Sequence, residues 1–175
     1  MLKRWLFLCL SVVALAACGQ HSASTSPTVQ AAIAAGEVGS RLPDFSVKDL
    51  HGLEITSEEL RGKVVLIDFW ATWCEPCKRE MPGYQQLLNR YGSKGFAVLG
   101  LKFNTMKDTE APKRFARRLG VLYPLAVATE DVRQKFGGIE GLPTTLIYDR
   151  KGILREKIIG FEYTEVVERS VKPLL

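Results

Sequence analysis

Two cysteines stand at the point where a buried strand gives way to a helix. The segment 64–70 is almost entirely apolar, and Cys74 and Cys77 follow it with two residues between them. An apolar run of this length predicts a strand buried on both faces, as in a sheet covered by helices. The segment 76–91 then has helical spacing. Both thiols are therefore expected at a helix N-terminus, where backbone N–H groups and the helix dipole stabilise a thiolate.

The first 17 residues have the pattern of an export signal. Lys3 and Arg4 precede an apolar stretch, 5–17, that is too short to span a bilayer as an ordinary helix. The stretch ends in Leu15-Ala16-Ala17-Cys18, which resembles the bacterial lipobox, in which the cysteine is acylated and becomes the new N-terminus. We therefore expect a lipid on Cys18. The alternative is an ordinary secretory signal with a chance cysteine.

Composition divides the remainder of the chain into a tether and one domain. Residues 19–40 are rich in Ala, Ser, Thr, Gly and Gln, which is typical of a flexible linker with an r.m.s. reach of about 25 Å. The length that follows is sufficient for one domain with its own core. We expect a signal peptide over 1–17, a lipidated cysteine and tether over 18–40, and a globular domain over 41–175.

Cysteine usage indicates redox chemistry in an oxidising compartment. Of the four cysteines, Cys9 leaves with the signal peptide and Cys18 carries the lipid. Cys74 and Cys77 would close a loop too small to gain much chain entropy, so they make a poor structural staple. The better interpretation is a reactive pair, in which one thiolate opens a disulfide of another molecule and the second thiol releases it.

The charge of the chain does not indicate nucleic acid as a partner. The formal net charge is +5, and it falls to +3 once Lys3 and Arg4 are removed. This excess is too small for the electrostatic footprint of a nucleic-acid-binding protein. A basic cluster at 113–118 lies on an expected helix and is interpreted as a solvated face. The alternative is a docking patch for an acidic partner or for lipid headgroups.

The order of expected elements predicts an α/β domain. Strands alternate with helices, which implies a partly parallel central sheet flanked by helices, and a closing strand–turn–strand–helix adds an antiparallel edge. An N-terminal hairpin precedes the first core strand. The expected strands are 45–47, 53–55, 63–70, 96–103, 123–128, 144–148 and 153–159, and the expected helices are 76–91, 108–119, 130–136 and one that starts at Thr164.

Two motifs carry a family resemblance. The stretch from Asp68 to Cys77, which ends in Trp73-Cys74-Glu75-Pro76-Cys77, resembles the active-site segment of the thioredoxin superfamily, and Gly141-Leu142-Pro143-Thr144-Thr145 resembles its cis-proline loop. The hairpin, the inserted helix and the Cys-Glu-Pro-Cys spelling are similar to the membrane-anchored TlpA/ResA-like branch, over residues 41–175. The resemblance implies a thioredoxin fold and a bacterial extracytoplasmic thiol–disulfide oxidoreductase, often a reductant that serves cytochrome c maturation.

The sequence departs from this branch in two places. Much of the branch has a neutral residue at the position of Asp68. Some members have an acidic residue after the strand 96–103, where this chain reads Asn104-Thr105-Met106. These departures weaken the assignment to cytochrome c maturation in particular and leave the assignment to disulfide chemistry intact.

Three residues are assigned catalytic roles. Cys74, which precedes the helix and is the exposed member of the pair, is the expected nucleophile, with a pKa lowered only moderately because Glu75 opposes the thiolate. Cys77, about one turn inside the helix, is more buried and resolves the mixed disulfide. Asp68 is expected near Cys77, directly or through water, as a proton relay with a raised pKa, or else as a core carboxylate that caps backbone groups. Lys102 is a candidate charge partner of Asp68, or a solvent-facing lysine.

The surface around the cysteines is expected to bind an extended substrate segment. As the resemblance implies, the Leu142–Pro143 bond is cis, and the loop offers backbone groups of Leu142 in the manner of strand addition. Trp73 is expected to form a partly exposed apolar rim, whereas Trp70 is assigned to the core. The expected substrate-binding residues are Trp73, Glu75, Pro76, Leu142 and Pro143.

These inferences favour a lipid-anchored thiol–disulfide oxidoreductase that reduces protein disulfides. No soluble cofactor is expected beyond the Cys74–Cys77 disulfide, and the resemblance implies re-reduction by a membrane dithiol partner. The expected location is the extracytoplasmic side of the bacterial envelope, facing the periplasm, and Gly19 after Cys18 favours the outer membrane. The expected oligomeric state is a monomer.

Three alternative functions stay open. The same cysteine pair would serve a disulfide oxidant or isomerase. A peroxiredoxin shares the N-terminal hairpin but resembles Pro-x-x-x-Thr-x-x-Cys, and this chain has Ile67 and Ala71 at the positions of the proline and the threonine. A metal-binding lipoprotein would use the Cys-x-x-Cys pair, yet a closed site needs more ligands, and the only histidines are His21 in the tether and His51 in a turn.

Overall fold

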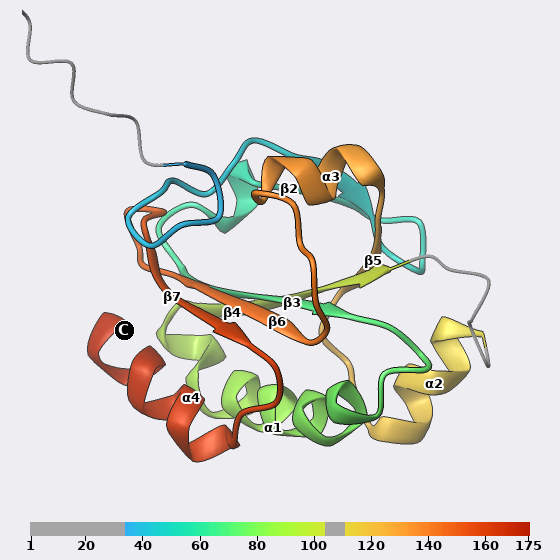
Figure 1. Ribbon diagram of the computed structural model, residues 1–175. Coiled ribbons are helices and arrows are strands. Elements are labelled where there is room, and N and C mark those ends of the chain that lie inside the picture. Colours follow the sequence, from blue (N-terminus) through green and yellow to red (C-terminus); the bar gives the residue numbers. More distant parts are fainter. Residues whose placement is uncertain (1–33, 104–110) are drawn as a thin grey trace, which may run out of the picture. The chain divides into compact units, whose positions relative to one another are not determined.

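The central strand of the domain is β3 (Val64–Trp70), which coincides with the apolar run. In the computed structural model, which describes residues 34–103 and 111–175, β3 lies in the middle of a five-stranded sheet of order β5-β4-β3-β6-β7 (Figure 1). Strands β3, β4 and β5 are parallel, whereas β6 is antiparallel to both β3 and β7. The other strands of this sheet are β4 (Phe96–Phe103), β5 (Leu125–Ala128), β6 (Thr144–Tyr148) and β7 (Leu154–Ile159).

Helices cover both faces of the sheet. Helices α1, α2 and α4 lie on one face, and α3 lies on the other face together with the hairpin of β1 and β2 (Figure 1). Three short 3-10 helices, η1 to η3, complete the described elements. The bounds of the hairpin strands and of all these helices are β1 (Ser46–Lys48), β2 (Glu54–Thr56), η1 (Glu58–Leu60), α1 (Glu75–Tyr91), η2 (Gly92–Lys94), α2 (Pro112–Leu119), α3 (Glu130–Lys135), α4 (Thr164–Val171) and η3 (Lys172–Leu174).

Two apolar clusters, one on each face of the sheet, enclose β3. Leu66 and Trp70 belong to the cluster that contains the buried side of α1, whereas Ile67 and Phe69 belong to the cluster beneath α3 and the hairpin. All seven residues of β3 are buried. Because side chains alternate along a strand, Asp68 points to the same face as Leu66 and Trp70, toward α1.

This architecture confirms the predicted α/β class, with a mixed sheet, flanking helices, an N-terminal hairpin and an inserted helix. The inserted helix α2 begins at Pro112, whereas the sequence placed its start at 108. Residues 104–110 lie outside the described residues, and so do the signal peptide, Cys18 and the tether as far as residue 33. Among the described residues, no helix has the length and the apolar content that crossing a bilayer requires.

The described chain before Arg41 is hydrogen-bonded to the domain. The N–H of Gly39 donates to the carbonyl of Leu154 at 2.8 Å, and the N–H of Leu154 donates to the carbonyl of Ser40 at 2.8 Å. The domain therefore begins before residue 41, the boundary drawn from composition. Composition misplaces this boundary because Gly39 and Ser40 join the domain through backbone hydrogen bonds. Backbone bonds of this kind cannot be recognised from the pattern of hydrophobic residues.

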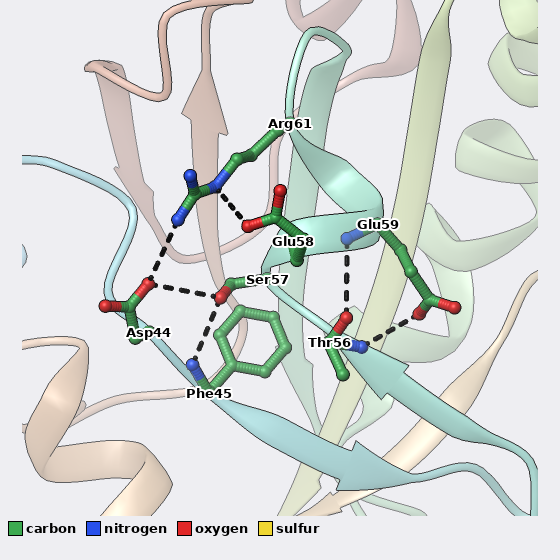
Figure 2. Close-up of polar contacts among 7 residues, drawn as sticks. All are labelled: Asp44, Phe45, Thr56, Ser57, Glu58, Glu59 and Arg61. Atoms are coloured by element: carbon green, nitrogen blue, oxygen red, sulfur yellow. Dashed lines mark hydrogen bonds and ion pairs between the residues drawn. The ribbon is translucent and has the colours of Figure 1, made fainter.

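Reciprocal hydrogen bonds fix the turn between the hairpin and β3. The N–H of Thr56 donates to Glu59 Oε2 at 2.9 Å, and the N–H of Glu59 donates to Thr56 Oγ1 at 3.4 Å, as in a capping box (Figure 2). The buried Ser57 hydroxyl accepts from the N–H of Phe45 at 3.4 Å and donates to Asp44 Oδ1 at 3.4 Å. These bonds hold the start of the domain against the turn that leads into β3.

A glycine allows α4 to pack closely on α1. At Gly83, in the middle of α1, a Cβ atom would overlap the Oγ1 atom of Thr164 at the start of α4. The close approach of the two helices therefore requires the absence of a side chain at position 83. Gly92, where α1 ends, has an ordinary φ of −57°, and a Cβ there would meet only Leu88 Cδ1, at 3.5 Å.

We expect Gly83→Ala to lower the melting temperature of the protein. Alanine favours the helix by about 1 kcal/mol, but forcing α4 away from α1 costs about 1–3 kcal/mol, so the net effect is destabilising. Gly92→Ala is the matched control and should leave the melting temperature unchanged or raise it. Thermal unfolding followed by circular dichroism checks both variants, and a Gly83→Ala protein as stable as Gly92→Ala would contradict this packing.

Candidate active site

The two cysteines form a disulfide at the N-terminus of α1. Cys74 is the N-cap residue, Cys77 lies in the first turn, and the two sulfur atoms are bonded to each other. The N–H of Cys77 points at Cys74 Sγ at a distance of 3.3 Å. Once the disulfide is reduced, this N–H is placed to stabilise a thiolate on Cys74.

Neither sulfur is well exposed in this oxidised state. Cys74 is 3% exposed and Cys77 is fully buried, so the predicted order of exposure holds, but Cys74 is far less accessible than an exposed nucleophile would be. The physical reason is that both cysteines belong to the apolar cluster on the α1 face, with Met81. Attack on the disulfide, or attack by Cys74, therefore takes place through a narrow opening.

The two tryptophans beside the cysteines have the predicted environments. Trp73 is 38% exposed and forms part of the surface next to Cys74, whereas Trp70 is fully buried. The ring of Trp70 stacks on Phe115 of α2, with 4.9 Å between ring centroids. Trp73 is therefore the aromatic ring that a bound partner can cover.

The negative charge of Glu75 is offset by a neighbouring lysine. Lys78 Nζ donates to Glu75 Oε2 at 2.7 Å, and this hydrogen bond is the main cause that lowers the pKa of the Glu75 carboxyl. The opposition of Glu75 to a Cys74 thiolate is therefore weaker than the sequence alone implies. Pro76, in the first turn of α1, lacks an N–H and leaves that of Cys77 as the donor nearest to Cys74 Sγ.

The cis-proline loop lies beside the end of β3. The Leu142–Pro143 bond is cis, which confirms the prediction. Thr144, the next residue, pairs with Phe69 on β3, so Pro143 is placed opposite the end of that strand, from which the chain continues to Cys74. The carbonyl of Pro143 accepts from the N–H of Gly160 at 2.8 Å. Within the described residues the backbone N–H and carbonyl of Leu142 make no hydrogen bond, so both are available to a partner.

Asp68 is a buried carboxylate without a hydrogen-bond partner. It is fully buried, and neither of its oxygens has a hydrogen-bond partner among the described residues. Burial raises the pKa of Asp68 from 3.8 to about 8. Its side chain faces α1, which also carries Cys77, as the proton-relay hypothesis requires.

Lys102, the candidate charge partner of Asp68, makes no hydrogen bond to the Asp68 carboxylate. Lys102 is buried, but its Nζ donates to the carbonyl of Phe103 at 2.9 Å. The register of the parallel strands explains the difference, because Lys102 lies opposite Trp70 whereas Gly100 lies opposite Asp68. The residue beside Asp68 on β4 therefore has no side chain at all.

Gly100 makes room for an aromatic wall next to Asp68. A Cβ atom at position 100 would overlap the side chain of Leu125 and would lie 3.0 Å from Trp70 Nε1 and 3.3 Å from Tyr123 Cε2. The Tyr123 hydroxyl is buried and has no partner among the described residues, and burial, followed by the charge of Asp68, raises its pKa well above 10. Asp68 thus lies in a buried region of the core with aromatic side chains beside it.

A second buried acid, Glu80, is a site residue that the sequence reasoning missed. Glu80 is 1% exposed, and neither of its carboxylate oxygens has a hydrogen-bond partner among the described residues. Burial, and then the charge of Asp68, raise the pKa of Glu80 from 4.5 to about 9, although the Tyr84 hydroxyl, the Glu162 backbone and the charge of Arg79 oppose this rise. The available signal was position, since Glu80 follows Cys77 by three residues and precedes Met81 on the apolar stripe of α1.

Asp68 and Glu80 form one titrating pair. Two carboxylates that interact in a buried site cannot both ionise easily, so the pair retains at least one proton near neutral pH. Tyr84 links the pair to the sheet, because its hydroxyl lies 2.9 Å from Oγ1 of Thr145, and Thr145 pairs with Asp68 in the strand register. The interface of β3 and α1 therefore contains two interacting carboxyls that hold at least one proton near neutral pH.

The part of the chain that the structure describes holds no cluster of metal ligands. No three His, Cys, Asp or Glu side chains gather there in a way that could hold a metal ion. His51 is exposed, and His21 lies outside the described residues.

Comparison with known proteins places the chain in a family. Residues 38–157 match the model of the AhpC/TSA family. The thiol-disulfide oxidoreductase ResA of Geobacillus kaustophilus (strain HTA426) is 35% identical over 165 residues, which cover 93% of this chain and 92% of the relative. The thioredoxin-like protein YneN of Bacillus subtilis (strain 168) is 32% identical over 172 residues, 98% of each chain.

A solved structure shows the same fold. The thiol:disulfide interchange protein of the thioredoxin family from Chlorobium tepidum TLS is 31% identical, with a TM-score of 0.70, and the match covers 80% of this chain and 99% of that one. The sheet order, the disulfide at a helix N-terminus and the cis-proline loop described above agree with these similarities. The chain therefore belongs to the AhpC/TSA family and is a thiol–disulfide oxidoreductase with the thioredoxin fold.

Proposed function

We propose that this chain is a lipid-anchored reductant of protein disulfides on the extracytoplasmic side of a bacterial envelope. The observation that carries the disulfide chemistry is the Cys74–Cys77 pair at the start of α1, beside a cis-proline loop with unused backbone groups. The lipid anchor on Cys18 is supported by the lipobox resemblance at 15–18, and outer-membrane placement by Gly19. A role in cytochrome c maturation is supported by the family resemblance. The support is weaker because Asp68 stands where much of that branch has a neutral residue.

The proposed reaction begins with reduced enzyme. The Cys74 thiolate attacks one sulfur of a substrate disulfide, a mixed disulfide forms, and the other substrate sulfur leaves as a thiolate that takes up a proton. Cys77 then loses its proton and attacks Cys74 Sγ, which forms the Cys74–Cys77 disulfide and releases the second substrate thiol. Two electrons have passed from the enzyme to the substrate, and a membrane dithiol partner would return them.

The Asp68–Glu80 pair is proposed to receive the proton of Cys77. Cys77 is fully buried, so its proton has no direct route to bulk water. The pair lies at the interface of β3 with α1, the helix that carries Cys77, and the ionised fraction of a carboxyl with a raised pKa is a strong enough base to accept a proton from a thiol. When the enzyme is reduced again, the same proton can return to Cys77.

Reduction, in place of oxidation or isomerisation, is supported by the modest stabilisation offered to the Cys74 thiolate. The N–H of Cys77 and the helix N-terminus favour the thiolate, while Glu75 carries a negative charge only partly offset by Lys78. A strong oxidant requires a much more stabilised thiolate in its reduced form. Extended protein segments are the proposed substrates. They would bind to a monomeric enzyme, along the backbone of Leu142 and over the exposed ring of Trp73.

The roles of Cys74 and Cys77 are tested by replacing each cysteine in turn. We expect Cys74→Ser to abolish the reduction of insulin disulfides, and Cys77→Ala to accumulate mixed disulfides at Cys74 because the resolving thiol is gone. Non-reducing electrophoresis and mass spectrometry identify the trapped partners. Insulin reduction by Cys74→Ser at the wild-type rate would overturn the mechanism, and rapid peroxide consumption by the wild type would favour the peroxiredoxin alternative.

The role of the acid pair in resolution is tested by amide variants. We expect Asp68→Asn and Glu80→Gln each to slow the attack of Cys77 on the mixed disulfide roughly 10- to 100-fold at pH 7, with the loss shrinking as pH rises because hydroxide then removes the thiol proton. Stopped-flow decay of a mixed disulfide measures this step. Glu75→Gln is the control, since its carboxyl is exposed, and equal slowing in all three variants would contradict the assignment.

The acid pair also predicts how stability depends on pH. Because the folded-state pKa of Asp68 is about 8 and its ordinary value is 3.8, the folded protein binds a proton that the unfolded chain has released between these values. The contribution of Asp68 to stability is therefore fully present below about pH 4 and is lost as pH rises to about 8, by at most about 1.4 kcal/mol per pH unit for one group. Urea unfolding of oxidised Asp68→Asn should show a shallower fall between pH 5 and pH 8 than the wild type does.

A further inference from the structure

The end of the domain opposite the disulfide contains a cavity. It lies where β3 begins, between residues 41–44, the turn after η1 and the turn 149–152, and has a volume of about 510 Å³. Because β3 has seven residues that rise about 3.3 Å each, roughly 20 Å of strand separates this cavity from the loop that carries Cys74. In Figure 1 the start of β3 and the first turn of α1 lie toward opposite ends of the sheet, and the described chain begins on the side where β3 starts.

The carboxylates that line this cavity are already paired. Asp149 accepts from Arg155 Nε at 2.7 Å and from the backbone N–H groups of Lys151 and Ile153, both at 2.9 Å. Asp44 lies 3.7 Å from the guanidinium of Arg61, which also binds Glu58 at 2.9 Å (Figure 2). Neither Asp44 nor Asp149 is therefore left over to neutralise the remaining cations of the cavity.

Four cations of the cavity have no carboxylate partner among the described residues. The side chains of Arg41, Lys63 and Lys151 make no ion pair or hydrogen bond with another described residue, and all three residues are exposed. Arg150 donates only to backbone carbonyls, those of Gly62 at 3.0 Å and Lys94 at 2.7 Å, so its guanidinium is held in place and keeps its full charge. The cavity thus concentrates positive charge from three separate segments.

Such a concentration of unpaired cations is a binding site for an anion. Like charges held around one hollow repel each other, and a phosphate that enters the hollow relieves this repulsion while it accepts hydrogen bonds from guanidinium and ammonium groups. Lys63 and Lys151 supply mobile point charges, whereas Arg150 supplies a fixed one. We propose that this cavity binds the phosphate of an anionic phospholipid headgroup, which places the disulfide end of the domain away from the bilayer.

The path of the chain favours a membrane lipid as the source of the phosphate. The first described residues join the domain at this end. The N–H of Leu42 donates to the carbonyl of Gly152 at 2.7 Å, and the backbone of Arg41 forms an isolated antiparallel β-bridge with Ile153. A lipid on Cys18 would therefore connect to the domain beside the cavity. This step rests on the proposed anchor but not on the disulfide chemistry, so each can fail without the other.

Lysine reactivity in vesicles tests the proposal. The native lipidated chain is placed in vesicles of neutral phosphatidylcholine alone or mixed with anionic phosphatidylglycerol, and acylation rates of individual lysines are measured by mass spectrometry. We expect Lys63 and Lys151 to react about fivefold more slowly in the anionic vesicles. Lys113, an exposed lysine of α2 near the disulfide end, is the internal control and should change much less.

A charge reversal sharpens this test. Lys63→Glu should remove most of the protection of Lys151 in anionic vesicles, whereas Lys113→Glu should leave it intact, and both variants should keep wild-type insulin reduction as a check on folding. Equal rates in the two vesicle types, or equal slowing of all three lysines, would overturn the proposal. Protection by inorganic phosphate alone in neutral vesicles would overturn the lipid as the source and assign the cavity to soluble phosphate.

Discussion

The burial of β3 between two apolar layers is the constraint on which the rest of the structure depends. A strand with no solvent face needs cover on both sides, so the chain that leaves Trp70 must turn and cross back over the sheet as α1. The turn places a helix N-terminus at the carboxyl end of the central strand, where sites in α/β proteins commonly form. Cys74 and Cys77 occupy that terminus, so the packing of the core determines where the disulfide lies.

The same burial gives the site its acid–base character. Asp68 and Glu80 enter the β3–α1 interface without hydrogen-bond partners among the described residues, and such groups oppose folding. An apolar pair at these positions would make a more stable core. Two buried acids at this interface oppose stability, which is the kind of local conflict expected at a functional site.

The sequence predicted the parts of this structure that depend on local pattern. The apolar run of β3, the order of elements and the cysteines at a helix start are all readable from spacing and turn residues. Spacing did not show that Lys102 and Asp68 make no hydrogen bond, because the β3–β4 register, which sets Gly100 beside Asp68, is a property of the assembled sheet. Glu80 was missed because it follows two basic residues and resembles part of a solvated turn until α1 is packed against the sheet.

The cis Leu142–Pro143 bond was accessible only through family resemblance, since residue preferences alone favour the trans form.

Gly100 illustrates how a residue of one strand shapes the surroundings of a residue on the next strand. Its missing side chain admits Trp70 and Tyr123 to the strand next to Asp68. A side chain at position 100 would therefore have to displace Leu125 and the rings of Trp70 and Tyr123, and the proton affinity of the buried acid beside it would change with that packing.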